Sequence, residues 1–230
     1  MRVIEGQYAD LIDPFPRKEI HRVYGWMHCY RTMTESDISP KTPEEFDSFF
    51  NSLLNTVVSY GIIDKQNLTN SKHEAPLVGI ITFEPHTIWN GFVHVASTRK
   101  AWGKGIMDEA GQLAIKDVFD NLPSILRLSA WIFKNNIPAQ HYVVRAGFRK
   151  EGVLRDYILQ DGAPKTIFQY GLTRREYATS SDHGGVSGGE QPVGGVVEIR
   201  ETGEPDHTLD QHLEPNPTPD EFVREPDQGS

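Results

Sequence analysis

The stretch AWGKGIMDEAGQLAIKDVF, residues 101–119, joins a glycine-rich turn directly to a helical pattern. Gly103 and Gly105 flank Lys104, and the apolar residues that follow recur at helical spacing. These apolar residues are Ile106, Ala110, Leu113, Ala114 and Val118. The free N–H groups and the dipole at the start of such a helix attract an anion such as a phosphate. A turn without a ligand explains the same residues, so both interpretations stay open on this stretch alone.

The segments around this stretch predict a mixed α/β domain with one layered core. Apolar runs bounded by turn residues indicate strands, and the last run is divided by a turn at Asp161-Gly162. These runs cover residues 57–64, 75–84, 87–97, 125–133 and 153–172. The polar residues 65–74 predict a hairpin loop between the first two strands.

Three further segments have helical spacing. The first is residues 16–30, and the second, within residues 39–57, begins with Thr42 as its cap and Pro43 in the first helical position. The apolar stripe predicted for this second helix is Phe46, Phe49, Phe50, Leu53 and Leu54. The third, residues 137–148, ends where Gly147 supplies a left-handed stop.

The composition changes sharply near Tyr177, which predicts a domain over residues 1–177 and a tail over residues 178–230. The tail is rich in Gly, Pro and Ser and carries 12 acidic residues against 2 arginines. Such a segment buries too little apolar surface to offset its ordering entropy, so we expect a disordered acidic tail. A solubilising extension and a partner-binding segment both fit this composition.

The remaining composition limits the classes of function. Residues 1–177 hold 21 basic and 20 acidic side chains, which argues against a nucleic-acid-binding core. Cys29 is the only cysteine, and His73, His86 and His94 lack ligand-like spacing, so no metal site is expected. The longest apolar run, residues 76–83, is too short to span a membrane, and a cytoplasmic protein is expected. No pattern indicates an oligomeric state.

The glycine-lysine-glycine turn does not match the common nucleotide-binding motifs. A Walker loop needs Ser or Thr directly after its lysine, but Gly105 follows Lys104. The three spaced glycines of a dinucleotide fingerprint are also missing. Asp108 and Glu109 fall in the first helical turn, where favourable interaction with the helix dipole is a sufficient explanation.

Four pieces of the sequence, taken in order, resemble a known family. They are WGKGIMDEA (102–110), DVF (117–119), NNIPAQHYVVRAGFRKEGVLRDY (135–157) and QYGLTRREY (169–177). Over residues 76–177 the chain resembles the GNAT superfamily of acetyl-CoA-dependent N-acetyltransferases, most of all the branch with the ribosomal-protein N-terminal acetyltransferases. The resemblance implies a central, mostly antiparallel sheet that is splayed at the cofactor site and has helices on both faces.

The resemblance also implies a set of residues that bind acetyl-CoA. The family's pyrophosphate loop falls on Trp102, Gly103, Lys104, Gly105, Ile106 and Met107. Trp102 stands where Gln or Arg is frequent, and Met107 where a small residue is usual. The splayed strand would leave the backbone of Val95, Ala96 and Ser97 free to bind the pantetheine arm as an added strand. The side chain of Asn136 is expected to hold the same arm.

Transfer of an acetyl group to an amine needs a proton acceptor, and three sources are open. The glutamate that the family often carries on this strand falls near Gly91, so His94 is the main candidate for the base. Glu84 and water are the alternatives, and a hydrogen-bonded structural role fits His94 equally. Tyr142 is the candidate acid for the leaving thiolate, although Val143 occupies the position where the family often has a tyrosine.

The sequence therefore predicts an N-acetyltransferase that moves an acetyl group from acetyl-CoA to a primary amine by direct attack in a ternary complex. A catalytically degenerate binding or scaffold module is one alternative, and an acyl or carbamoyl transferase acting on a nucleobase is another. The acceptor amine is open among a protein N-terminus, a polyamine and a small metabolite. Its choice is expected to depend on the loops at residues 26–34 and 160–165.

Overall fold

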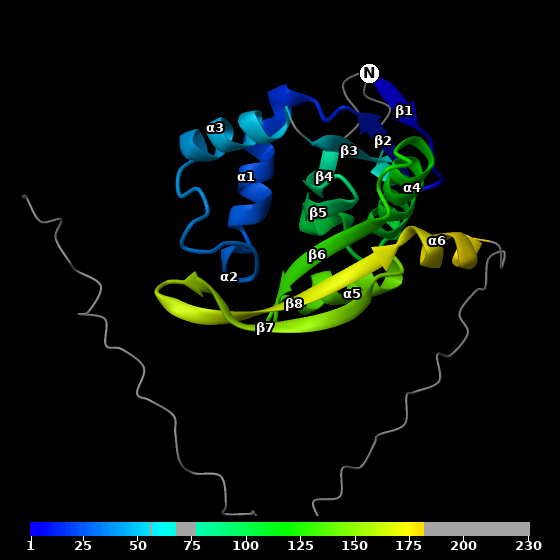
Figure 1. Ribbon diagram of the computed structural model, residues 1–230. Helices are drawn as coiled ribbons and strands as arrows, with labels where there is room; N and C mark the ends of the chain where they lie inside the picture. The colour runs from blue at the N-terminus through cyan, green and yellow to red at the C-terminus, as the bar shows by residue number, and fades with distance from the viewer. Residues whose placement is uncertain (56, 68–76, 182–230) are drawn as a thin grey trace, which may run out of the picture. The chain divides into compact units, whose positions relative to one another are not determined.

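The computed structural model describes residues 1–55, 57–67 and 77–181 (Figure 1). The predicted tail beyond Ser181 and most of the predicted hairpin loop at residues 65–74 lie outside the described residues. The strands are β1 (Arg2–Ile4), β2 (Ala9–Asp13), β3 (Val58–Asp64), β4 (Leu77–Thr87), β5 (Asn90–Ser97), β6 (Arg127–Phe133), β7 (Arg149–Gln160) and β8 (Ala163–Thr173). The α-helices are α1 (Ile20–His28), α2 (Arg31–Thr34), α3 (Pro43–Leu53), α4 (Ile106–Asn121), α5 (Ile137–Arg145) and α6 (Arg174–Ser181).

The eight strands form one sheet in the order β1-β2-β3-β4-β5-β6-β8-β7. Each neighbouring pair is antiparallel except β5 and β6, which run parallel. The parallel ladder has three registered pairs and ends at Phe92–Ser129, beyond which the two strands separate. The prediction of a mostly antiparallel sheet with a splay at this point is confirmed.

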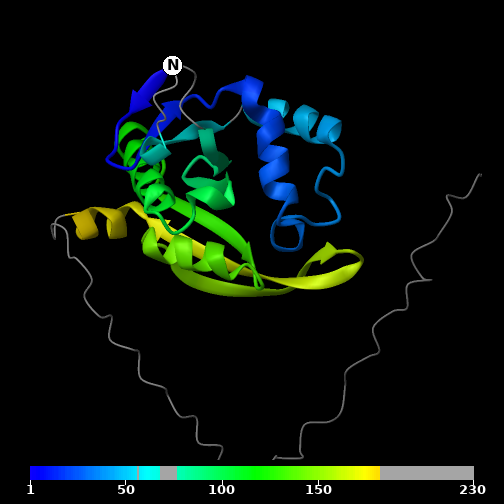
Figure 2. The same cartoon turned by 180° about the vertical axis from the view of Figure 1, so that it is seen from behind.

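Helices cover both faces of the sheet, as expected (Figures 1 and 2). The core on one face joins α4 and α5 to the strands, with Ile106, Val118 and Leu128 almost fully buried. The core on the other face joins α1 and α3 to β3 and β4 through Val23 and Phe46. The two faces are called below the α4 face and the α1 face.

Several local predictions are confirmed. The Thr42 hydroxyl accepts from the Glu45 N–H at 3.2 Å and the Glu45 carboxylate accepts in return, which makes a capping box with Pro43 in the first turn of α3. Gly147 has φ +96° just after α5, and Asp161 and Gly162 have φ +52° and +71° in the β7–β8 turn.

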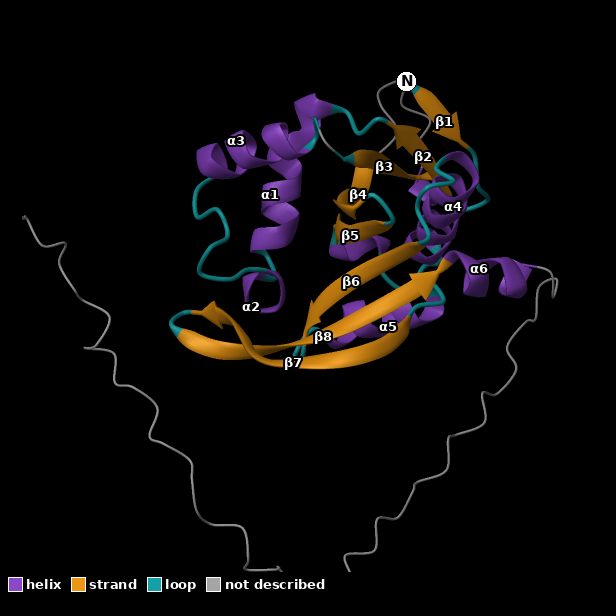
Figure 3. Cartoon of the chain, in the orientation of Figure 1, coloured by secondary structure: helices purple, strands orange, loops and turns teal. Residues whose placement is uncertain are grey.

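Other predictions need correction (Figure 3). Strands β1 and β2 and helix α6 are not predicted by the sequence patterns, and the predicted helix over residues 16–30 divides into a 3-10 turn, α1 and the separate α2. Phe49 was predicted in the buried stripe of α3, but it is 54% exposed because α3 packs only its Phe46 and Phe50 side onto the core.

Candidate active site

The glycine turn lies at the start of α4, as the sequence predicts. Gly103 and Gly105 both have left-handed backbone, with φ of +69° and +77°, and Gly105 is the N-cap of the helix. Nothing lies within 4 Å of the position that a Cβ at Gly103 would occupy. The turn therefore leaves room beside the first N–H groups of α4, which have no carbonyl partner within the helix.

Neighbouring side chains hold this turn in place. The indole N–H of Trp102 donates to the Ser97 hydroxyl at 2.9 Å, and the Gln66 amide donates to the Lys104 carbonyl at 3.0 Å. The Tyr8 ring lies 3.6 Å from the position of a Cβ at Gly105. The turn is thus fixed from three sides, while the Lys104 side chain is exposed.

The residues that open α4 face away from a ligand. Ile106 and Met107 are 0% and 8% exposed and belong to the core on the α4 face, so the Met107 side chain does not occupy the space beside Gly103. The Glu109 carboxylate accepts from the backbone N–H groups of residues 7–9 at 2.6–2.7 Å. From the sequence, interaction with the helix dipole was a sufficient explanation for an acidic residue at position 109. The structure shows that the Glu109 carboxylate also anchors the β1–β2 connection.

The gap between β5 and β6 exposes backbone of β5. The Thr98 N–H donates to the Val78 carbonyl at 2.8 Å. Because backbone polar groups alternate in direction along an antiparallel strand, Ala96 and His94 also direct their N–H and C=O groups toward β4. Ala96 is therefore paired with β4, which corrects the expectation that its backbone is free. Val95 and Ser97 alternate with it and direct their N–H and C=O groups to the open side.

His94 and Glu84 form a pair on the α1 face. The Nε2 atom of His94 lies 3.0 Å from a Glu84 carboxylate oxygen, and the two side chains are 47% and 43% exposed. Because a carboxylate can only accept, this hydrogen bond places the imidazole proton on Nε2 and leaves Nδ1 as a proton acceptor. The two residues that the sequence offered as alternatives thus lie together.

Tyr142 lies on the α4 face and is separated by the sheet from His94. Its hydroxyl packs against Gly111 of α4, only 2.5 Å from the position of a Cβ there. Burial raises the pKa of Tyr142 well above its ordinary value, so the phenol keeps its proton at neutral pH. Val143 is buried in the same core. The two predicted catalytic side chains are therefore not brought into contact.

The Asn136 side chain is engaged within the protein. Its oxygen accepts from the Ala139 N–H at 3.2 Å and caps α5, while its amide donates to the Met33 carbonyl at 3.0 Å. This side chain therefore ties α2 to α5, and a further hydrogen bond to a ligand would use its remaining amide hydrogen or lone pair.

The two loops predicted to choose the acceptor do come together. The Gln160 amide donates to the carbonyls of Arg31 and Glu35 at 3.1 and 2.7 Å, and the Asp37 carboxylate accepts from the N–H groups of the β7–β8 turn. A cavity of about 240 Å³ lies here, lined by His28, Arg31, Glu35, Ser36, Asp37, Lys41, Gln160 and Asp161.

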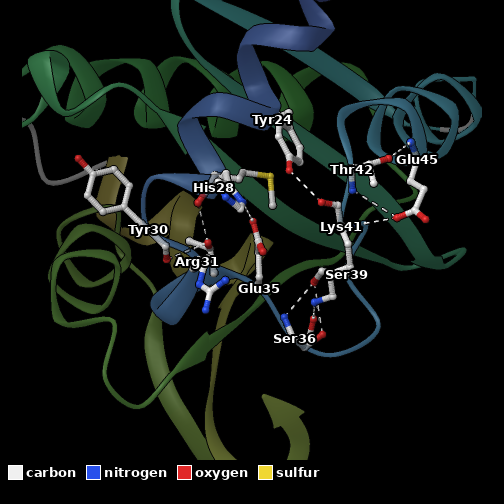
Figure 4. A network of polar contacts seen from close by, with 12 residues as sticks. Tyr24, His28, Tyr30, Arg31, Glu35, Ser36, Ser39, Lys41, Thr42 and Glu45 are labelled. Carbon is white, nitrogen blue, oxygen red and sulfur yellow. Dashed lines mark hydrogen bonds and ion pairs between the residues drawn. The ribbon is translucent and has the colours of Figure 1, made fainter. Parts of the chain in front are cut away.

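Figure 4 shows the α1–α3 side of this cavity, where His28 points toward Glu35. Their closest nitrogen and oxygen atoms are 3.4 Å apart. The Tyr24 hydroxyl donates to the Lys41 carbonyl, and the Lys41 ammonium donates to the Ser36 carbonyl. No local sequence signal predicts these polar links, because each joins residues that a turn brings together.

The described residues contain neither a metal-binding group nor a membrane-spanning helix. No group of three or more His, Cys, Asp and Glu side chains in this part of the chain is arranged to hold a metal ion. None of the helices in residues 1–181 that the structure describes is long and apolar enough to cross a membrane.

Comparisons with known proteins agree with this arrangement. Residues 10–149 match the family model described as the acetyltransferase (GNAT) domain. The uncharacterized N-acetyltransferase p20 of Bacillus licheniformis is 36% identical over 80 residues, which cover 35% of this chain and 44% of that protein. The chain thus spans less than half the length of the curated relatives it matches.

Solved structures share the fold at low sequence identity. The ribosomal-protein-S5-alanine acetyltransferase of Vibrio fischeri aligns with a TM-score of 0.60 and 18% identity, over 75% of this chain and 97% of that chain. The spermidine N-acetyltransferase of Vibrio cholerae, in complex with CoA and spermine, aligns with a TM-score of 0.60 and 15% identity, over 74% of this chain and 98% of that chain. The family match, the splayed sheet and the glycine turn at α4 together show that this chain belongs to the GNAT acetyltransferase family.

Proposed function

We propose that this protein transfers an acetyl group from acetyl-CoA to a primary amine. The observation that carries the proposal is the gap beyond Phe92–Ser129. His94, paired with Glu84, lies two residues past Phe92 on β5, and the chain continues from β5 toward the glycine turn of α4. A thioester held in this gap is accessible from the α1 face, where a proton acceptor is present. Solved structures of relatives with CoA bound support the same assignment.

The residues that would hold acetyl-CoA follow from the geometry. The N–H groups at the start of α4 and the space beside Gly103 suit the pyrophosphate, and Lys104 adds a positive charge. The free backbone groups of Val95 and Ser97 suit the amides of the pantetheine arm. When bound, acetyl-CoA supplies an activated acyl carbon and a thiolate leaving group.

The chemical roles of the side chains are assigned as follows. The amine nitrogen forms a bond to the acyl carbon while the carbon–sulfur bond breaks, and Nδ1 of His94 takes the amine proton. Glu84 orients the imidazole and stabilises its positive charge. A β5 N–H directed into the gap can donate to the developing oxyanion. Tyr142 is the proton donor for the thiolate in this proposal, and its hydroxyl lies on the α4 face against Gly111.

The glycine turn gives a direct test by calorimetry with acetyl-CoA. Gly103→Val places a side chain in the open space beside the helix start, so we expect at least a tenfold loss of affinity. Gly162→Val is the matched control, because Gly162 also has left-handed φ and open space but lies in the β7–β8 turn. Both variants should lose similar stability from backbone strain.

Equal acetyl-CoA affinity in the two variants would contradict the phosphate-site assignment. Turnover is then measured as CoA thiol release with a panel of primary amines. Acetyl-CoA binding without thiol release from any amine would favour the binding-module alternative over an enzyme.

A further inference from the structure

A row of aromatic rings crosses the α1 face of the sheet from β5 to β7. The ring of His94 lies 5.1 Å from that of Phe92, Phe92 lies 4.9 Å from Trp131, and Trp131 lies 5.2 Å from Tyr157. The last two contacts are edge-to-face, the arrangement that aromatic pairs favour. The four rings, called here the aromatic row, form one continuous surface from three strands.

The aromatic row crosses the gap between β5 and β6. The last registered pair is Phe92–Ser129, and both His94 and Trp131 lie two residues farther along their strands. Because side chains alternate along a strand, His94 and Trp131 share a face with this pair and flank the gap on opposite sides. A group that reacts in the gap would therefore have the proposed base on one side and an indole on the other.

Tyr157 lies in an irregular part of strand β7. The register of β7 against β8 shifts between Leu154 and Ile158, and Asp156 has φ +51°. Such bulges change the direction of a side chain and are frequent next to active sites. Here the irregularity directs Tyr157 toward Trp131.

The aromatic row is accessible, and the carboxylate recorded in contact with it is that of Glu84, at the His94 end. Trp131 and Tyr157 are 38% and 48% exposed, although both are large and apolar. Glu84 is the acidic partner at the His94 end, and Phe92, Trp131 and Tyr157 are uncharged. A polyamine needs several carboxylates along its length, whereas an amine with one charge and an apolar body matches this surface.

We propose that the acceptor is a primary monoamine with an aromatic group within a few bonds of its nitrogen. This inference rests on the proposed acetyl transfer and names its substrate class. The nitrogen binds at Nδ1 of His94, and the aromatic group packs on Trp131 and Tyr157. Trp131 is thus a residue that determines specificity for the acceptor.

The test compares amines by the rate of CoA thiol release. 2-Phenylethylamine carries the predicted group, n-butylamine lacks it, and spermidine represents the polycations. Phenylalanyl-glycine amide presents the same group at a peptide N-terminus and separates a peptide source from a free amine. We expect kcat/KM for one of the two aromatic amines to exceed that for butylamine and spermidine at least tenfold.

Substitution of Trp131 tests the role of the aromatic row. Trp131→Ala should raise KM for the preferred aromatic amine about tenfold or more, change kcat little and leave butylamine unaffected, while Trp131→Phe should retain most of the preference. Trp89→Ala is the matched control. Trp89 is 54% exposed in the β4–β5 turn, and within the described part of the chain it is not part of the aromatic row.

Two outcomes overturn the inference while acetyl transfer stands. One is use of spermidine or butylamine as efficiently as the aromatic amines. The other is an unchanged KM for the aromatic amine in folded Trp131→Ala protein. Absence of thiol release with every amine would instead overturn the proposed function itself, and this inference with it.

Discussion

At the scale of single residues, the His94–Glu84 contact changes the question that the sequence left open. The sequence offered two candidate bases, but the 3.0 Å contact makes one of them the orienting partner of the other. A carboxylate that accepts from Nε2 fixes the tautomer and the orientation of the imidazole. The pair can therefore work as one unit in which Nδ1 is the atom that takes the proton.

This assignment predicts a specific loss in the His94→Gln variant. Removal of the proton acceptor should lower kcat about 10²-fold or more, while acetyl-CoA affinity stays unchanged because the phosphate turn is intact. Glu84→Gln should lower kcat less, and the double variant should be no slower than His94→Gln alone, because both side chains act as one unit. The measurements are steady-state turnover and calorimetry.

His141→Gln is the control, since His141 is an exposed histidine on α5. If His94→Gln protein remains folded and loses less than about threefold in kcat, His94 is only a structural side chain of the sheet. Water or the free-amine fraction of the acceptor would then accept the proton.

At the scale of elements, α6 shows how a short sequence signal specifies a helix start. The Glu176 carboxylate accepts from the backbone N–H of Thr173 at 3.0 Å and from its hydroxyl at 2.7 Å, and the hydroxyl accepts from the Glu176 N–H at 3.2 Å. This is a second capping box, written in the sequence as Thr-Arg-Arg-Glu. The signal was present, although the last element predicted within residues 1–177 was the β7–β8 hairpin.

The capping box makes the stability of α6 depend on pH. The hydrogen bonds from the backbone and hydroxyl of Thr173 lower the pKa of Glu176. A lowered pKa in the folded state gives stability that is present above the unfolded pKa of about 4.3 and is lost as pH falls through the folded pKa. Glu176→Gln should therefore lower the melting temperature at pH 7, and the difference from wild type should shrink below about pH 4.

Thermal unfolding at several pH values checks this prediction. Glu44→Gln is the control, because Glu44 is an exposed first-turn glutamate of α3 outside its capping box. A difference between wild type and Glu176→Gln that is constant from pH 7 to pH 3 would contradict the role assigned to the charge.

At the scale of the whole described domain, α6 is joined to the core by Arg174. Its guanidinium donates to the carbonyls of Phe119 in α4 and of Leu122 and Ile125 in the α4–β6 connection, and it lies over the Phe119 ring. Tyr177 packs on the same ring at 5.1 Å. The helix continues to Ser181, four residues past the predicted boundary, so the boundary at residue 177 stays a prediction.

Truncation tests where the folded domain ends. A chain that ends at Ser181 should keep the melting temperature of the full chain within about 2 °C, because the removed residues offer few core-forming side chains. A chain that ends at Thr173 should melt several degrees lower, since it lacks Arg174 and Tyr177. A large loss of stability in the longer of the two chains would show that the removed segment packs on the domain.

The sequence by itself determined the features that depend on a few neighbouring residues. The cap at Thr42, the turn at Asp161-Gly162, the stop at Gly147 and the glycine turn before α4 are local, because each follows from the φ preference or side-chain reach of its own residues. The helical spacing of α4 likewise identified the face that it buries.

Only the tertiary structure decided the features that join distant segments. Strands β1 and β2 are three and five residues long. They exist because β2 pairs with β3 and β1 pairs with β2, and no local pattern records these pairings. Glu109 reaches backbone about 100 residues earlier, and the exposure of Phe49 depends on where α3 meets its core. The orientation of the Ala96 backbone, the His94–Glu84 pair and the aromatic row depend on register between strands. Register is set by the packing of the whole sheet and not by any one strand.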